Sequence, residues 1–121
     1  MRATVIGGTG HIGRFLVGQL IEDGWTVTVV SSGRAPLPRE RGWERAHHAV
    51  GRYDGGPEWR RLMAELKPDL VVDIIQRDLA ATYDAVAGVA RHYIVCGSVW
   101  MLGAATMVPT PERIFGEAFG A

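Results

Sequence analysis

Apolar and polar residues follow two alternating patterns along this chain. Short, nearly continuous apolar runs that are rich in β-branched residues predict parallel β-strands buried on both faces. Between these runs, apolar residues recur every three or four positions, which predicts amphipathic helices. The predicted strands cover 1–6, 25–30, 46–50, 69–75 and 92–98, and the predicted helices cover 11–23, 58–66, 78–89 and, more weakly, 112–119.

Regular alternation of strands and helices is typical of a doubly wound α/β fold. Parallel strands need right-handed crossovers, so we expect a Rossmann-type parallel sheet of about five strands in the order 3-2-1-4-5. The run at 69–75 is almost wholly apolar and is therefore expected near the middle of the sheet. The chain contains no internal repeat, and residues 1–121 are expected to form a single domain. In the first helix the expected buried stripe is Ile12, Phe15, Leu16 and Leu20.

A glycine-rich turn joins the first predicted strand to the first predicted helix. Gly7, Gly10 and Gly13 stand three residues apart. A strand that stops on glycines and continues as a helix presents unpaired N–H groups at the positive end of the helix, which favours a phosphate. The first glycine permits the tight turn, the second lets a pyrophosphate approach, and the third lets the helix pack closely on the strand. The pattern indicates a dinucleotide-binding loop; a purely structural turn is the alternative.

Composition and charge narrow the range of partners. Hydrophobic residues make up 47% of the chain and charged residues 21%, an ordinary balance for a globular protein. The 13 basic residues equal the 13 acidic ones, which gives no electrostatic reason to expect binding to nucleic acid. No apolar run approaches the roughly 20 residues that span a membrane, and the sequence enters a strand without a signal peptide. We therefore expect a cytoplasmic protein without a membrane or nucleic-acid partner.

The end of the second predicted strand is where a Rossmann-type fold selects its cofactor. An acidic residue there accepts hydrogen bonds from the ribose 2′-hydroxyl of NAD. In this chain Ser31 and Ser32 occupy that position and Arg34 follows them. A guanidinium pairs with a 2′-phosphate, and serines can donate to it, so NADP is favoured over NAD. The alternative for Arg34 is a solvated loop charge.

The segment from Val5 to Gly13 resembles the opening of the extended and atypical short-chain dehydrogenase/reductases, the NAD(P)-dependent epimerase/dehydratase group. This resemblance implies the cofactor-binding part of an enzyme that exchanges a hydride with its substrate. It also implies an acidic contact to adenine after the third strand. Asp54 is the nearest acid there, although a turn-forming role is the alternative. Ile75 and Gln76, at the end of the fourth strand, are expected to line the site.

Residues 92–103 are similar to a second segment of the same group. Ser98 lies five residues before Gly103, where the resemblance implies a catalytic serine that hydrogen-bonds the reacting oxygen of the substrate; an ordinary strand-end serine is the alternative. The group's Tyr-x-x-x-Lys pair, a general acid/base and its partner, is absent, because Lys67 is the only lysine and no tyrosine follows Tyr93. These 121 residues are expected to bind cofactor without turnover. A non-catalytic nucleotide-binding or redox-sensing module and a truncated fragment without autonomous activity are the alternatives.

The predicted site draws on the glycine loop and on the ends of three strands. His11 could touch a phosphate from within the loop, or face solvent. An unpaired apolar edge at 92–96 predicts self-association, so a homo-oligomer is expected. No metal ligands are predicted, and the sequence does not specify the substrate. The predicted cofactor-binding residues are Gly7, Gly10, His11, Ile12, Gly13, Ser31, Ser32, Arg34, Asp54, Ile75 and Gln76.

Overall fold

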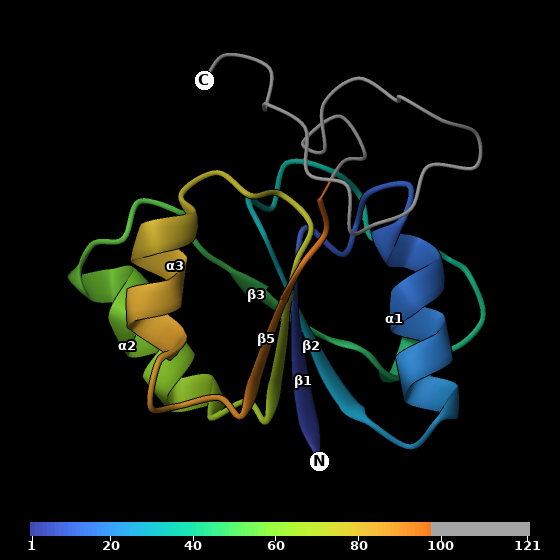
Figure 1. Ribbon diagram of the computed structural model, residues 1–121. Helices are drawn as coiled ribbons and strands as arrows, with labels where there is room; N and C mark the ends of the chain where they lie inside the picture. The colour runs from blue at the N-terminus through green and yellow to red at the C-terminus, as the bar shows by residue number, and fades with distance from the viewer. Residues whose placement is uncertain (98–121) are drawn as a thin grey trace, which may run out of the picture.

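Five parallel strands form one sheet in the computed structural model, which describes residues 1–97 (Figure 1). The hydrogen-bonded order is β3-β2-β1-β4-β5, which confirms the predicted topology. The strands are β1 (Arg2–Ile6), β2 (Thr26–Ser31), β3 (His47–Val50), β4 (Leu70–Asp73) and β5 (His92–Val95). The helices are α1 (Gly13–Glu22), α2 (Pro57–Leu66), α3 (Leu79–Val86) and the short 3₁₀ helix η1 (Trp43–Arg45). Ser98 and the helix predicted over 112–119 lie outside the described residues.

The sheet is covered on both faces, with α1 on one side and α2 and α3 on the other (Figure 1). Successive residues of a strand point to opposite faces, so β1 supplies Val5 to the α1 side and Ile6 to the α2–α3 side. On the α1 side, Val5 belongs to a core that includes Val17, Val29 and Trp43. The core of the opposite side includes Trp59, Met63, Val71 and Val86. Both faces of the central strands are therefore buried, as their continuous apolar runs predict.

Strand β4 lies between β1 and β5, as expected, but ends at Asp73 rather than at residue 75. The Asp73 carboxylate is the physical reason. Its Oδ1 accepts hydrogen bonds from the backbone N–H groups of Ile75 (3.1 Å) and Gln76 (2.9 Å). A short polar side chain that bonds the following backbone replaces ladder bonds with a turn. Gln76 accordingly adopts a left-handed conformation with φ of 55°.

The buried face of α1 differs from the predicted stripe. Phe15 and Ile12 are 63% and 56% exposed, while Gly13, Val17, Gly18 and Ile21 are buried. Glycines set the rotation of this helix. A Cβ on Gly13 would lie 2.5 Å from the carbonyl oxygen of Gly8, and one on Gly18 would lie 2.7 Å from that of Arg41. Both close contacts require glycine. They therefore determine which face of α1 is buried, and the apolar residues three and four positions apart do not.

Several helix ends carry typical capping residues. Asp78 caps α3, since its Oδ1 accepts a hydrogen bond of 2.9 Å from the N–H of Ala81. Gly24 follows α1 with φ of 91°, and Pro57 opens α2. Besides the end of β4, three boundaries differ by two residues or more: α1 begins at residue 13 rather than 11, α3 ends at 86 rather than 89, and β5 ends at 95 rather than 98. Helix α3 stops because the next residue is non-helical and Gly88 has φ of 78°.

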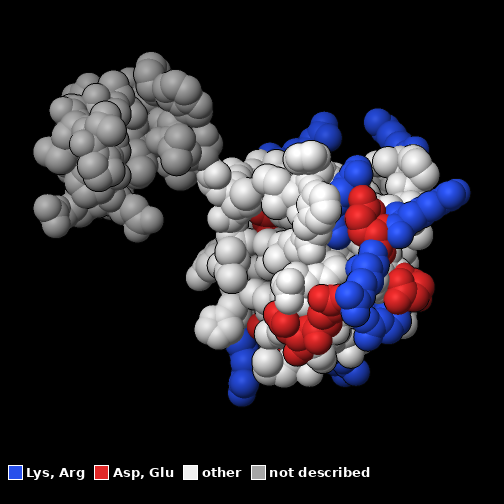
Figure 2. Space-filling model, turned by 90° about the vertical axis from the view of Figure 1, so that its right-hand side faces the viewer, with Lys and Arg blue, Asp and Glu red and all other residues white. Residues whose placement is uncertain are grey.

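The side of the molecule formed by α1 carries interspersed acidic and basic side chains (Figure 2). Arg14 and Glu40 approach to 3.1 Å, and Arg41 and Glu22 to 3.0 Å, which ties the segment after β2 to α1. No helix within residues 1–97 has both the length and the apolar character to cross a membrane.

Candidate functional site

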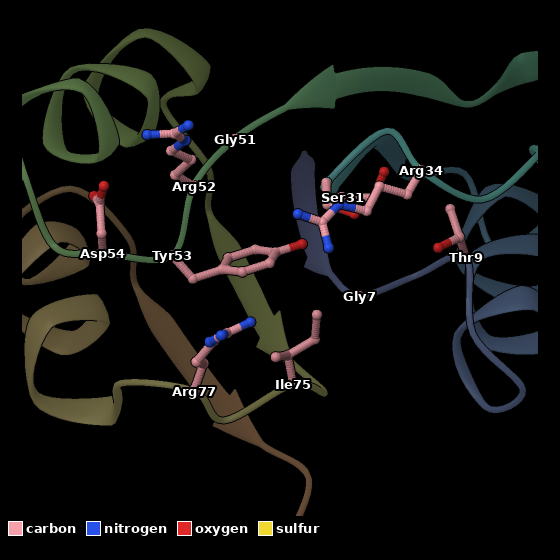
Figure 3. Close-up of a pocket in the computed structure, with 11 residues that line it drawn as sticks. Gly7, Thr9, Ser31, Arg34, Gly51, Arg52, Tyr53, Asp54, Ile75 and Arg77 are labelled. Atoms are coloured by element: carbon pink, nitrogen blue, oxygen red, sulfur yellow. The ribbon is translucent and has the colours of Figure 1, made fainter.

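A cleft of about 500 Å³ opens at the carboxyl ends of the strands (Figure 3). In open parallel sheets this edge is where ligands bind, because successive crossovers leave a crevice there. The loops that follow β1, β2, β3 and β4 all contribute to its walls. The lining residues are Gly7, Thr9, Ser31, Ser32, Arg34, Gly51, Arg52, Tyr53, Asp54, Ile75 and Arg77.

The turn between β1 and α1 forms one wall of this cleft. Gly7 has φ of 82°, and its N–H donates to the carbonyl of Val30 at 3.0 Å. A Cβ on Gly7 would lie 2.5 Å from the side chain of Ile75, so this position has neither the conformation nor the space for another residue. The first turn of α1 has no side-chain cap on Ile12 and no acidic residue, unlike α3 with its Asp78 cap. An uncapped helix start of this kind suits an anion.

Gly8 is a close-packed position that the sequence prediction missed. A Cβ on Gly8 would lie 2.9 Å from Val29 and 3.1 Å from Val17, so this glycine brings the loop against both β2 and α1. Gly13 packs closely, as expected, but against Gly8 rather than against a strand. Among residues 1–97, and leaving out the two chain neighbours of Gly10, only the Gly7 carbonyl oxygen, at 3.5 Å, lies within 4 Å of the position of a Cβ on Gly10. Gly10 therefore leaves open space at the turn.

The two residues between Gly10 and Gly13 point away from the cleft lining. His11 and Ile12 are exposed, and neither lines the cleft. The ring of His11 makes an edge-on contact with Phe15 at 6.4 Å between centroids.

The end of β2 places two serines and an arginine in the cleft. Ser31 is 6% exposed, and its Oγ lies 2.6 Å from Nε2 of His48 while accepting a 3.2 Å hydrogen bond from the N–H of Gly33. Ser32 and Arg34 are exposed and line the cleft beside it. His48 was not predicted as part of the site. The parallel register pairs Ser31 with Val50, which brings the β3 residue two positions earlier within reach.

Tyr53 projects its ring into the middle of the cleft, and the sequence prediction missed this residue (Figure 3). Its hydroxyl donates a 3.2 Å hydrogen bond to the carbonyl of Val30, and its ring packs edge-on against Trp59 at 5.3 Å. Burial, followed by the negative charge of Asp73, raises the pKa of Tyr53 above its ordinary value of 10.0. Asp54 also lines the cleft, but its Oδ1 accepts a 3.0 Å hydrogen bond from the N–H of Gly56, the turn that was the alternative.

The loop after β4 is held by a buried carboxylate. Asp73 is 2% exposed, and its Oδ2 accepts a 2.8 Å hydrogen bond from the hydroxyl of Tyr93 on β5. Burial raises the pKa of Tyr93. The Asp73 carboxylate raises this pKa further, because it accepts a hydrogen bond from the phenolic hydroxyl and its negative charge disfavours the phenolate. The network presents Ile75 and Arg77 to the cleft, whereas Gln76 is outside its lining. Ile75 therefore lies where predicted, and Arg77 is a further lining residue that the sequence prediction did not include.

Positive charge predominates in the lining. Arg34, Arg52 and Arg77 contribute three guanidinium groups, and Asp54 contributes one carboxylate. Within residues 1–97, the three salt bridges are Arg14–Glu40, Arg41–Glu22 and Arg45–Glu44, and none of them involves a cleft arginine. The same residues hold no cluster of His, Cys, Asp or Glu that could bind a metal ion. The arrangement suits an anionic ligand.

Comparison with known proteins identifies the family. Residues 3–91 match the sequence model of the NAD-dependent epimerase/dehydratase family. The chain belongs to this family. It is 34% identical over 115 residues to 2′-dehydrokanamycin reductase from Streptomyces kanamyceticus. That match covers 93% of this chain and 32% of the reductase, so the chain spans about a third of the length of this relative.

Solved structures of epimerase-family proteins share the fold. A UDP-galactose 4-epimerase is 26% identical, with a TM-score of 0.75, over 98% of this chain and 45% of the epimerase. The Bordetella bronchiseptica enzyme WbmG, solved in complex with NAD, is 21% identical, with a TM-score of 0.74, over 98% of this chain and 44% of WbmG. The present chain therefore corresponds to less than half of each of these structures.

Proposed function

We propose that these residues are the dinucleotide-binding part of an NAD(P)-dependent epimerase, dehydratase or reductase. Membership of the NAD-dependent epimerase/dehydratase family supports this proposal. The observation that carries it is the uncapped start of α1 behind the turn at Gly7, which opens into a cleft rich in arginine. An oriented helix terminus and guanidinium groups both stabilise phosphate oxygens.

In this proposal the pyrophosphate lies over the turn between β1 and α1. The backbone N–H groups of His11, Ile12 and Gly13 would face it, while the N–H of Gly10 donates to the Gly7 carbonyl at 3.2 Å and holds the turn. Binding through the backbone would explain why the side chains of His11 and Ile12 do not need to line the cleft. Gly10 provides the open space for this approach, since a side chain there would project toward the bound phosphates. When bound, the nicotinamide supplies the hydride chemistry, and the protein supplies binding and orientation.

The proposed cofactor is NADP rather than NAD. Ser31 ends β2 and Ser32 and Arg34 come after it, and all three line the cleft. None of them is a carboxylate that would accept from a 2′-hydroxyl and repel a 2′-phosphate. The acidic residue on the β3 side, Asp54, has one oxygen engaged by the N–H of Gly56. The bound NAD in the solved WbmG complex supports a dinucleotide in this family, and the preference for the 2′-phosphate is specific to our proposal for this chain.

The adenine end of the ligand is proposed to lie on the β3 side of the cleft. The ring of Tyr53 is fixed there by its hydrogen bond to Val30 and by Trp59, which leaves a flat apolar surface for a base. Asp54 lies at the same wall and could accept from the adenine amino group. Ile75 would close the opposite wall, after β4.

Calorimetric titration with NADPH tests the proposal. The native chain is expected to bind, and Gly10→Asp is expected to abolish binding, because it places a carboxylate against the pyrophosphate. Gly10→Ala separates bulk from charge: within residues 1–97 its Cβ would contact one backbone atom at 3.5 Å, so this variant is expected to weaken binding less than Gly10→Asp does. Equal NADPH affinities for the native chain and Gly10→Asp would overturn the assignment of the glycine loop.

Further parts of the proposal concern catalysis and assembly. We propose that Ser98, outside the described residues, positions a substrate oxygen in a complete active site, and that the single domain 1–121 functions in the cytoplasm. We also propose self-association through β5, where Ile94 is 53% exposed and the neighbouring Tyr83 on α3 is 58% exposed. Light scattering at micromolar concentration is expected to report a dimer or larger species, and a monomer would contradict this part.

A further inference from the structure

Two arginines enter the cleft from opposite sides of the glycine turn. Arg34 follows β2 and Arg77 follows β4, and these strands flank β1 on its two sides. Figure 3 shows both guanidinium groups extending into the cleft, with Arg77 directed toward the ring of Tyr53 and Arg52 directed away from it. The two cations that point inward therefore enter the cleft from the two strands that flank β1.

The position of Arg77 is set by the buried carboxylate of Asp73. Its Oδ1 accepts hydrogen bonds from the N–H groups of two consecutive residues before Arg77, Ile75 and Gln76. Gln76 is held in a left-handed conformation. The other oxygen is held by the Tyr93 hydroxyl at 2.8 Å. Since Ile75 packs against Gly7, the same turn fixes the distance between the β4 loop and the glycine loop. Arg77 is the next residue after this constrained turn.

The charge of Arg77 has no acidic partner within residues 1–97. A guanidinium that is directed into a cleft without an internal carboxylate is available to an anionic ligand. The ribose-recognition residues Ser31, Ser32 and Arg34 all follow β2, on the far side of β1 from Arg77. Arg77 therefore enters the cleft across the glycine turn from the residues proposed to bind the 2′-phosphate.

We propose that Arg77 binds the pyrophosphate of the dinucleotide and that the Asp73–Tyr93 hydrogen bond positions it. This assignment rests on the proposed function. It gives the 2′-phosphate and the pyrophosphate of the cofactor to two different arginines. Arg34 distinguishes NADP from NAD through the 2′-phosphate. Arg77 contributes to the binding of every ligand that carries the pyrophosphate.

Titration calorimetry with ADP, NADH and NADPH tests the division. Arg77→Met keeps most of the side-chain length and removes the charge. This variant is expected to weaken the binding of all three ligands by the same factor of roughly five to ten. Arg34→Met is expected to weaken NADPH alone. Arg91→Met is the matched control, because this exposed arginine precedes β5, at the other end of the strands from the cleft, and should leave all three affinities unchanged.

The outcomes separate this inference from the proposed function. A loss confined to NADPH in Arg77→Met would overturn the assignment to the pyrophosphate, and unchanged affinities would overturn the binding role altogether. If the native chain binds none of the three ligands, the proposed function itself is wrong and the role of Arg77 fails with it. Native binding together with an unchanged Arg77→Met would contradict the role of Arg77 alone.

A double-mutant cycle tests the positioning role of Tyr93. Tyr93→Phe removes the hydroxyl that holds Asp73, and is expected to weaken ADP binding about three-fold in the native background. In the Arg77→Met background it is expected to have no further effect, because there is no guanidinium left to position. Equal losses in both backgrounds would contradict positioning and indicate a purely structural role. Tyr83→Phe, at an exposed position, is the control.

Discussion

The hydroxyl of Tyr93 donates a 2.8 Å hydrogen bond to Oδ2 of Asp73, a carboxylate that is 2% exposed at the end of β4. Buried charge is tolerated only where hydrogen bonds replace water, and here both oxygens are engaged. Oδ1 accepts from two backbone N–H groups, of Ile75 and Gln76. The pair thus links β5 to β4 and to the loop that lines the cleft.

Removing this hydroxyl is expected to destabilise the fold. Tyr93→Phe leaves Oδ2 of Asp73 buried without its donor, which costs about 1–3 kcal/mol in the free energy of unfolding. Tyr83→Phe should change it by less than about 0.5 kcal/mol, since Tyr83 is 58% exposed. Urea unfolding of the three chains measures the difference. Equal stabilities for native and Tyr93→Phe would show that the hydrogen bond does not contribute.

Stability is expected to fall at high pH through the same residue. Burial and the Asp73 carboxylate raise the pKa of Tyr93 above the ordinary value of 10.0. The unfolded chain therefore loses this proton at lower pH than the folded chain, so the stabilisation is complete below pH 10 and declines as the pH rises above it. Tyr93→Phe should show a smaller decline between pH 9 and pH 11, approximate limits chosen around the ordinary tyrosine pKa. Parallel declines would contradict the shift.

Gly13→Ala tests the contact between the helix and the glycine turn. The added Cβ would lie 2.5 Å from the carbonyl oxygen of Gly8, so the backbone must move, at a cost of roughly 1–3 kcal/mol. Gly10→Ala makes the same chemical change where the nearest atom is 3.5 Å away, and should alter stability by less than about 1 kcal/mol. Thermal unfolding of both variants gives the comparison. A Gly13→Ala chain as stable as the native one would contradict the close packing.

Much of the fold follows from local patterns. The five apolar runs and the helices between them are enough to predict the strand order, because right-handed crossovers leave few alternatives. The rotation of α1 could not be predicted from hydrophobic periodicity, since it depends on the approach of Gly13 to Gly8 and of Gly18 to the Arg41 carbonyl. Propensity and period contain no information about such backbone contacts.

The site was predictable only in part, for a related reason. Gly7, Ser31, Ser32, Arg34, Asp54 and Ile75 follow strand ends and line the cleft as expected. The bonds that complete the site join residues far apart in sequence: Ser31 to His48, Tyr53 to Val30 and Tyr93 to Asp73. Only the strand register brings these partners together.

These 121 residues are expected to bind cofactor without catalysing hydride transfer. Proton transfer to or from a substrate hydroxyl by a positioned group contributes roughly 10²–10⁴-fold, and no tyrosine or lysine follows Ser98 to provide it. The measurement is absorbance of reduced nicotinamide during incubation with NADP or NADPH and a panel of sugars, sugar nucleotides and small ketones. Steady turnover that disappears in Ser98→Ala would contradict the prediction.

The most direct test of the account compares NADPH with NADH by titration calorimetry on the native chain and on Arg34→Ala. The central claim is that the cleft at the ends of β1, β2, β3 and β4 binds a 2′-phosphorylated dinucleotide. The native chain should bind NADPH more tightly than NADH by roughly 1–3 kcal/mol, the range for a charge-assisted contact, and Arg34→Ala should remove most of that difference. A native chain that binds NADH as tightly as NADPH, or more tightly, would contradict the claim.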